Sequence, residues 1–210
     1  MRKEEYLAEP CRASSLPFWK TEQFSVPRDI KVVREDLFDG DLRAYTDEPY
    51  FKMIRPLKGI SRPELPAPFR IIQCGTDDFA RHIRECYTEE GATEEELRAC
   101  SLRPVYDPEL WIAVGDATNQ RIAATGIADV DTGIREGILE WIQVSPDYRH
   151  KGLGRFLVLE LLYRMQGKAD FATVSGRMRN PENPYALYRA CGFTAPVIWH
   201  VIRARAPENA

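Results

Sequence analysis

The fold is decided by the stretch Val144-Ser-Pro-Asp-Tyr-Arg149-His-Lys-Gly152-Leu-Gly154 and by the mostly apolar residues 155–162 that follow it. The pattern predicts a strand that ends, a basic turn that contains glycine, and an amphipathic helix. The first backbone N–H groups of such a helix have no acceptor within the helix and lie at the positive end of its dipole, so they form a site for a phosphate or pyrophosphate. Glycine lets the backbone approach an anion closely. The residues predicted to form this anion loop are Arg149, His150, Lys151, Gly152, Leu153, Gly154 and Arg155.

The turn differs from two well-known phosphate-binding loops. It contains neither Gly-x-x-x-x-Gly-Lys-Ser/Thr nor a Gly-x-Gly-x-x-Gly with an acidic residue some 20 positions on. It does match Arg/Gln-x-x-Gly-x-Gly/Ala, with Arg149, Gly152 and Gly154 at the defined positions. The alternative for Arg149 and Lys151 is that both side chains are merely solvated, and His150 is expected to be exposed.

A second motif follows downstream, Asn183-Pro-Tyr-Ala186-Leu-Tyr188-Arg-Ala-Cys-Gly192-Phe193. Asn183 is a good N-cap, proline suits the first helical position, and Gly192 can end the helix in a left-handed conformation. In this order, the two motifs resemble the acyl-CoA pyrophosphate loop and the second signature of the GNAT acyltransferase superfamily. The resemblance implies an α/β (α+β) fold with a mixed central sheet flanked by helices, here with an N-terminal extension.

Three segments are expected: a proline-rich extension over residues 1–68, an acyltransferase domain over residues 69–205, and a tail over residues 206–210. The extension holds eight of the fifteen prolines and two plausible extended pieces, residues 29–34 and 50–57. It is also rich in aromatic residues, including Phe18, Trp19, Phe24 and Phe51. Disordered tails contain few aromatic residues, so we expect this arm to pack on the core and to form part of the acceptor pocket.

From residue 69 onward the pattern is regular. Strands are predicted at 69–74, 110–114, 121–131, 136–144, 171–175 and 197–203, and helices at 76–87, from 94, at 153–165 and around 188. Thr93 and Glu96 form a capping box for the second helix. On the helix after the anion loop, leucines recur every four residues and Glu160 and Arg164 are placed on the solvent side.

Composition excludes several classes of protein. The chain has 210 residues, a formal net charge of −3 and a pI of about 5.7, which argues against a general nucleic-acid binder. Its apolar runs are too short to span a membrane and its N-terminus lacks a signal-peptide pattern, so a cytoplasmic protein is expected, as a monomer or homodimer. The five cysteines and three histidines show neither a disulfide framework nor the spacing of metal ligands, so no metal is expected.

The resemblance implies that the strand over residues 138–144 contacts the pantetheine arm of acetyl-CoA. Alternation along a regular strand would put Ile138, Glu140, Ile142 and Val144 on one face. The backbone groups of Ile142 and Val144 are the expected pantetheine contacts. An ordinary sheet strand would have the same pattern.

Two residues are candidates for proton transfer. Glu140 is a charge within an apolar strand, close to the position at which several family members carry a catalytic base. Its alternative role is an ion pair, for instance with Arg121. Tyr188 matches the tyrosine that protonates the leaving thiolate in the family, and its alternative role is that of a packed aromatic residue. Asn183 is expected first to cap its helix and second to contact the cofactor.

Two other features have mainly structural interpretations. An acidic cluster could attract a cationic amine, but acidic first turns of helices are common for electrostatic reasons alone. Its members are Glu89, Glu90, Glu94, Glu95 and Glu96. Cys11 has no recognisable base partner in the sequence, so packing is favoured over a nucleophilic role.

These features favour an N-acyltransferase that uses acetyl-CoA as cosubstrate and moves the acetyl group directly to an amine of a small molecule or peptide. The alternative is a non-catalytic acyl-CoA-binding module, which needs the anion loop but neither Glu140 nor Tyr188. A third possibility, a nucleotide-phosphate-binding protein unrelated to CoA, would be stabilised by ATP and not by CoA.

Overall fold

The structure is a computed structural model that describes residues 1–21, 23, 25–40, 42, 45–87 and 91–204. Phe24, Glu89, Glu90 and the predicted tail lie outside these residues. The chain divides into two compact units, and each is described by itself. Unit 1 consists of Met1–Arg55 and Thr173–Ala210, and unit 2 of Pro56–Ala172.

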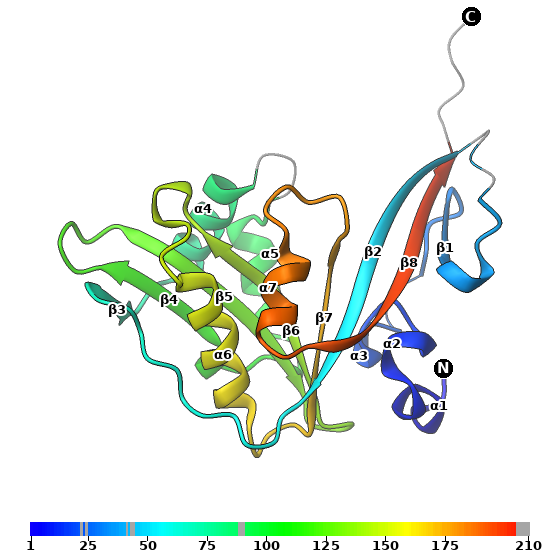
Figure 1. The fold of residues 1–210 in the computed structure, drawn as a ribbon, viewed down its shortest axis with the longest axis horizontal. Coiled ribbons are helices and arrows are strands. Elements are labelled where there is room, and N and C mark those ends of the chain that lie inside the picture. The colour runs from blue at the N-terminus through cyan, green and yellow to red at the C-terminus, as the bar shows by residue number, and fades with distance from the viewer. Residues whose placement is uncertain (22, 24, 41, 43–44, 88–90, 205–210) are drawn as a thin grey trace, which may run out of the picture. The chain divides into compact units, whose positions relative to one another are not determined.

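Unit 2 contains an antiparallel sheet in the order β3-β4-β5-β6. Figure 1 shows α6 in front of these strands and α4 and α5 behind them. The elements are β3 (Phe69–Ile72), α4 (Thr76–Cys86), α5 (Glu94–Cys100), η2 (Pro108–Leu110), β4 (Trp111–Asp116), β5 (Ile122–Asp131), β6 (Glu136–Val144), η3 (Pro146–Tyr148) and α6 (Leu153–Met165). The predicted capping box is confirmed, because the Thr93 hydroxyl accepts from the N–H of Glu96 and the Glu96 carboxylate accepts from the N–H of Thr93.

The two faces of this sheet are packed by different helices. On one face, Phe79 and Ile83 of α4 and Leu97 of α5 form a buried cluster with Ile127 of β5. On the other face, a β-carbon at Gly126 would contact side chains of Leu157 and Leu161 in α6. Because residues 126 and 127 are consecutive in one strand, they point to opposite faces, so α4 and α6 cover opposite sides of the sheet.

Strand β6 contains a β-bulge that corrects the predicted alternation. Trp141 lies opposite Ile127 and Leu139 lies opposite Ala128, so β6 has one more residue here than β5, and that residue is Glu140. Gly137 faces Met165 of α6, and the side chain of Ile142 also lies on the α6 side, although the two residues are an odd number of positions apart. The prediction that Ile138 shares a face with Ile142 is therefore wrong, because the bulge reverses the alternation.

The environment of Glu160 also differs from the prediction. Its side chain is only 1% exposed, and the guanidinium of Arg164 lies 2.9 Å from its carboxylate. The segment that precedes β3 covers this side of α6: Ile60 exchanges hydrogen bonds of 2.9 and 2.8 Å with the Gln166 amide, and Arg62 lies 3.5 Å from Glu160. Glu160 is thus buried because a loop lies over a helix face that would otherwise be exposed.

Unit 1 combines an N-terminal segment, Met1–Arg55, with a C-terminal segment that starts at Thr173. Strand β8 pairs antiparallel with β1 on one side and β2 on the other, and β7 follows β2 in the sheet (Figure 1). The elements are α1 (Lys3–Ala8), α2 (Pro10–Ala13), α3 (Phe18–Thr21), β1 (Ile30–Arg34), η1 (Glu35–Leu37), β2 (Tyr45–Pro56), β7 (Phe171–Arg177), α7 (Pro184–Ala190) and β8 (Thr194–Ala204). The two extended pieces predicted in the arm are therefore the strands that enclose β8.

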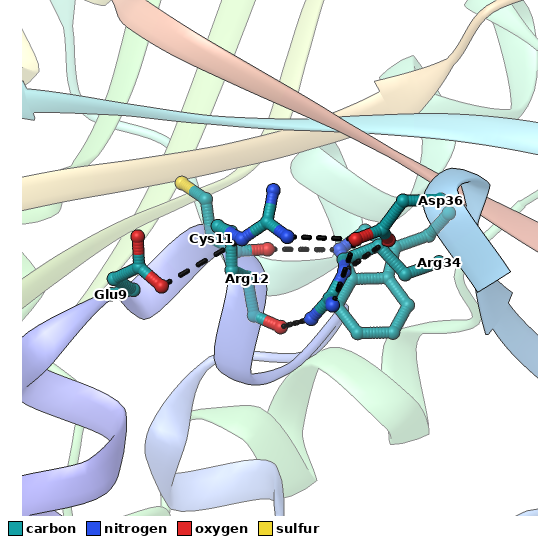
Figure 2. Close-up of polar contacts among 6 residues, drawn as sticks. Glu9, Cys11, Arg12, Arg34 and Asp36 are labelled. Atoms are coloured by element: carbon teal, nitrogen blue, oxygen red, sulfur yellow. Dashed lines mark hydrogen bonds and ion pairs between the residues drawn. The ribbon is translucent and has the colours of Figure 1, made fainter.

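The helices at the N-terminus are held to these strands by polar contacts. Figure 2 shows Arg12 of α2 beside Arg34 and Asp36. Arg34 donates to the carbonyl oxygen of Arg12 at 2.9 Å, and Arg12 donates to the Asp36 carboxylate at 2.8 Å. The hydrogen bond from Arg34 lowers the pKa of Asp36 to about 2. The indole N–H of Trp199 in β8 donates to the carbonyl oxygen of Cys11 at 2.9 Å, and Cys11 is buried at this junction.

Candidate active site

The anion loop connects β6 to α6 and is anchored by one buried aromatic residue. Tyr148, at the end of η3, is 5% exposed, packs edge-on against Phe69, and accepts a hydrogen bond of 2.9 Å from the Asn119 amide. The next residues leave the core: Arg149 is half-buried, whereas His150 and Lys151 are exposed. Tyr148 therefore fixes one end of a turn whose charged side chains reach solvent.

The turn enters α6 through a glycine in a left-handed conformation. Gly152 has φ +83° and is the N-cap of the helix, so a residue with a β-carbon would be strained there. The first hydrogen bond of the helix runs from the N–H of Phe156 to the carbonyl oxygen of Gly152. Helix geometry gives the earlier N–H groups, such as those of Leu153 and Gly154, no acceptor within the helix. The side chain of Leu153 is buried, so this residue can offer an anion only its backbone.

Positive charge surrounds the loop. The Lys151 ammonium lies 4.9 Å from the centre of the Tyr148 ring, and Arg121 lies over the same ring at 5.8 Å. Arg155 is exposed in the first turn of α6. One carboxylate, that of Asp147, is also present and pairs with Arg121 at 3.2 Å. The N-terminus of α6 and the cationic side chains of Arg121, Lys151 and Arg155 thus lie around the loop. This arrangement suits a phosphate or pyrophosphate group.

The backbone groups of Ile142 and Val144 point away from β5. The N–H of Ser145 donates to the carbonyl oxygen of Ala123 at 2.9 Å, which makes positions 145 and 123 a hydrogen-bonded pair. Alternation in an antiparallel ladder then directs the N–H and C=O groups of Val144 and Ile142 to the other edge of β6. Both carbonyl oxygens accept hydrogen bonds from side chains: Arg149 donates to that of Val144 at 3.4 Å, and Tyr87 donates to that of Ile142 at 3.3 Å.

Glu140 lies at the bulge, two residues before Ile142, and its side chain is half-buried. The predicted alternative partner, Arg121, pairs with Asp147 instead. Arg121 precedes β5, whereas Glu140 lies opposite the junction of residues 127 and 128, which is about 20 Å farther along the strand. An ion pair between Glu140 and Arg121 is therefore ruled out by the register of the sheet.

Two residues near the β6 edge were not found by sequence reasoning. Tyr87 follows α4 and packs edge-on against Trp141, which brings its hydroxyl group to Ile142. His82, one turn earlier in α4, is 1% exposed and lies 2.8 Å from the hydroxyl of Ser145. Neither belongs to a motif, and a lone aromatic or histidine in a helix most often indicates packing, so no signal distinguished them.

The second predicted motif lies in unit 1 and has the expected local structure. The Asn183 side chain accepts from the N–H of Ala186 at 3.2 Å and so caps α7, and Gly192 ends it with φ +84°. The Tyr188 side chain is 7% exposed, and its ring packs against Phe51 and Phe193 at centroid distances of 6.0 and 5.7 Å. The structure thus brings the loop, Ile142, Val144 and Glu140 together in unit 2, and places Asn183 and Tyr188 in unit 1.

No group of three or more His, Cys, Asp or Glu side chains among the described residues is arranged to hold a metal ion. Within the same part of the chain, every helix is too short or too polar to cross a membrane. Of the acidic cluster, the described members form the first turn of α5, where Glu96 completes the capping box and Glu94 pairs with Arg98.

Comparison with known proteins shows what part of the chain is similar to a known family. Residues 107–195 match the acetyltransferase (GNAT) domain. No protein of curated function matches the sequence. A GCN5-related N-acetyltransferase from Sphaerobacter thermophilus superposes with a TM-score of 0.62 at 20% identity, over 77% of this chain and 53% of that one. This chain therefore spans about half the length of that relative.

Two further structures have the same fold. An acetyltransferase of the GNAT family from Colwellia psychrerythraea gives a TM-score of 0.55 at 13% identity, over 82% of this chain and 64% of that one. Another acetyltransferase of the GNAT family, from Novosphingobium aromaticivorans, gives a TM-score of 0.54 at 14% identity, over 87% of this chain and 71% of that one. The predicted mixed α/β fold with a sheet flanked by helices is confirmed.

Proposed function

Since residues 107–195 match the family model of the acetyltransferase (GNAT) domain, we propose that this protein transfers an acetyl group from acetyl-CoA directly to an amine of a small molecule or peptide. The observation that carries the proposal is the anion loop. A left-handed glycine, the N–H groups of a helix N-terminus and several cationic side chains lie directly after a strand in which the backbone groups of Ile142 and Val144 point away from β5. This combination suits a ligand with a pyrophosphate and an extended amide-containing arm.

In this proposal the residues of unit 2 bind the cosubstrate. The N–H groups of the first turn of α6, with Arg149, His150, Lys151 and Arg155, hold the pyrophosphate, and Gly152 and Gly154 allow its close approach. The outward N–H and C=O groups of Ile142 and Val144 hydrogen-bond the amides of the pantetheine arm as a further strand would. Acetyl-CoA supplies an activated thioester, and the chain supplies orientation and hydrogen bonds.

Proton transfer is assigned to two side chains. Glu140 accepts a proton from the acceptor ammonium, directly or through water; in support, its side chain is half-buried and it lies two residues before Ile142. Tyr188 donates a proton to the departing thiolate, and Asn183 caps its helix and contacts the cosubstrate. These roles are supported by the match of both motifs to the family.

One observation favours a second candidate function. Tyr188 is enclosed by Phe51 and Phe193, as a purely structural aromatic residue would be. A non-catalytic acyl-CoA-binding module would keep the loop and use Tyr188 only for packing. A cytoplasmic location and a monomeric or homodimeric state remain predictions that either function would allow.

The experiment that tests the proposal measures CoA release from acetyl-CoA with and without a panel of amines, alongside thermal shifts with CoA and with ATP. Amine-dependent release that requires Glu140 and Tyr188 supports the enzyme. Stabilisation by CoA without turnover of any amine would favour the binding module. Stabilisation by ATP alone would overturn both.

A further inference from the structure

A chain of buried hydrogen bonds runs from β6 through α4 to the start of the anion loop. The side-chain amide of Gln143 donates to the hydroxyl of Thr125, which lies 2.8 Å from Nδ1 of His82. Nε2 of His82 lies 2.8 Å from the hydroxyl of Ser145, and that hydroxyl donates to the carbonyl oxygen of Ile122 at 3.2 Å. All four side chains are buried.

The two ends of this chain fix its direction. A side-chain N–H group at Gln143 can only donate and a backbone carbonyl at Ile122 can only accept. If each hydroxyl uses its single proton once, Thr125 donates to Nδ1 of His82, Nε2–H donates to Ser145, and Ser145 donates to Ile122. The His82 ring is therefore neutral, and its one N–H proton is on Nε2. The opposite direction would deprive the Ile122 carbonyl of the Ser145 proton.

The surroundings of His82 keep the ring neutral. Burial, with a smaller contribution from the charge of Arg81, lowers the pKa of His82 to about 4. The thiol of Cys86 lies 3.7 Å from Nε2, and burial raises the pKa of that thiol to about 11, so it too carries no charge near neutral pH. A neutral ring can accept at one nitrogen and donate at the other, as the chain of bonds requires.

Ser145 is the first residue after β6, and the loop is built on it. Its N–H bonds to Ala123, and its carbonyl oxygen accepts from the N–H of Tyr148 at 2.9 Å. The hydroxyl is held by His82 and Ile122, so both main-chain and side-chain atoms of this residue are fixed. The residue that starts the turn toward Gly152 is thereby attached to α4, on the opposite side of the sheet from α6.

We propose that His82 is a positioning residue for the anion loop: its neutral ring fixes Ser145 and so holds the backbone N–H groups of the loop in the geometry that binds the phosphates of CoA. This assignment rests on the proposed function of the loop. It gives α4 an influence on cosubstrate affinity that is transmitted through Ser145.

The test compares four variants with the wild type for CoA affinity by titration calorimetry and for kcat and KM. His82→Leu removes both hydrogen bonds, and the Kd for CoA and the KM for acetyl-CoA should rise about tenfold, the loss expected for one ordering hydrogen bond. His82→Gln retains one acceptor and one donor, and should keep both values within about twofold. Ile83→Ala is the matched control, because this neighbouring buried residue of α4 packs in the apolar cluster with Leu97 and Ile127; it should lower Tm without changing CoA affinity.

Ser145→Ala removes the hydroxyl from the loop side and should reproduce the effect of His82→Leu, even if the leucine variant fails to fold. The imidazole ¹⁵N shifts of the wild type should report a neutral ring protonated at Nε2. Equal losses in the Leu and Gln variants, unchanged affinity in Ser145→Ala, or protonation at Nδ1 would overturn the assignment while leaving the proposed function intact. A wild-type protein that does not bind CoA would overturn the proposed function and this assignment together.

Discussion

The ammonium group of Lys52 lies 2.7 Å from the carbonyl oxygen of Leu16. It also lies 3.0 Å from the carbonyl oxygens of Pro10 and Ser14 and from the hydroxyl of Tyr6. Lys52 is 1% exposed, so its charge is buried among acceptors from the N-terminal helices. Four acceptors converge on one side chain of β2, and this explains how a proline-rich segment with short helices is ordered.

Replacing this lysine should release the N-terminal helices. Lys52→Met leaves several buried acceptors without a donor, so the free energy of unfolding should fall by roughly 2–4 kcal/mol. Urea denaturation measures the loss, and limited proteolysis should cut faster within residues 1–21. Lys31→Met is the matched control, since Lys31 also contacts a tyrosine, at 3.4 Å from the Tyr45 hydroxyl, but is exposed; its effect should stay within about 0.5 kcal/mol. Equal effects of the two changes would contradict this role for Lys52.

Substitutions in the anion loop should abolish CoA binding and preserve the fold. Gly152→Glu or Gly154→Glu places bulk and negative charge where the pyrophosphate is expected, so the thermal shift produced by CoA should disappear. Gly167→Glu is the control, because Gly167 has nearly the same φ, +82°, with open space around it at the other end of α6. A folded Gly152→Glu protein that binds CoA as tightly as the Gly167 variant would rule out the pyrophosphate site.

Removing the hydroxyl of Tyr188 should slow the chemical step. Tyr188→Phe keeps the ring packed against Phe51 and Phe193, so CoA affinity should hold while kcat falls by roughly 10²-fold or more. Tyr185→Phe serves as the control, since its ring also packs against Phe51 from the same helix, and it should be neutral. Single-turnover rates separate chemistry from product release. Identical rates for the two variants would return Tyr188 to a packing role.

The stability of the protein should depend on pH through His82. Its pKa falls from 6.5 to about 4 on folding, so between these values the unfolded chain binds a proton that the folded chain does not. The contribution is fully present above pH 6.5, is lost as the pH falls toward 4, and amounts to roughly 3 kcal/mol. Urea midpoints at pH 7.5 and 5 should differ more in the wild type than in His82→Gln. The same pH dependence in both proteins would show that another group is responsible.

Sequence reasoning located most elements because their signals are local. The N-cap at Asn183, the capping box at Thr93 and the left-handed Gly192 each depend on a few neighbouring residues, and all three are present. Whether Glu140 and Tyr188 act in catalysis stays a prediction, since their roles depend on a bound substrate.

The features that were missed depend on contacts between distant residues. The bulge at Glu140 is visible only in the pairing of β6 with β5, and the burial of Glu160 depends on the segment around Ile60. The acceptors around Lys52 come from residues far apart in the chain. Alternation and helical periodicity describe one element at a time, so neither could reveal these contacts.

The position of β8 between β1 and β2 has a consequence for how the chain is made. Both neighbours of β8 are synthesised early, and all of Pro56–Ala172 emerges from the ribosome before β8 can pair with them. Unit 2, by contrast, is continuous in sequence. During translation the strands β1 and β2 therefore wait without their β8 partner, while the anion loop of unit 2 can already form. Such late, non-local pairing is slow and vulnerable to aggregation, so nascent chains of this protein are expected to depend on chaperones until β8 arrives.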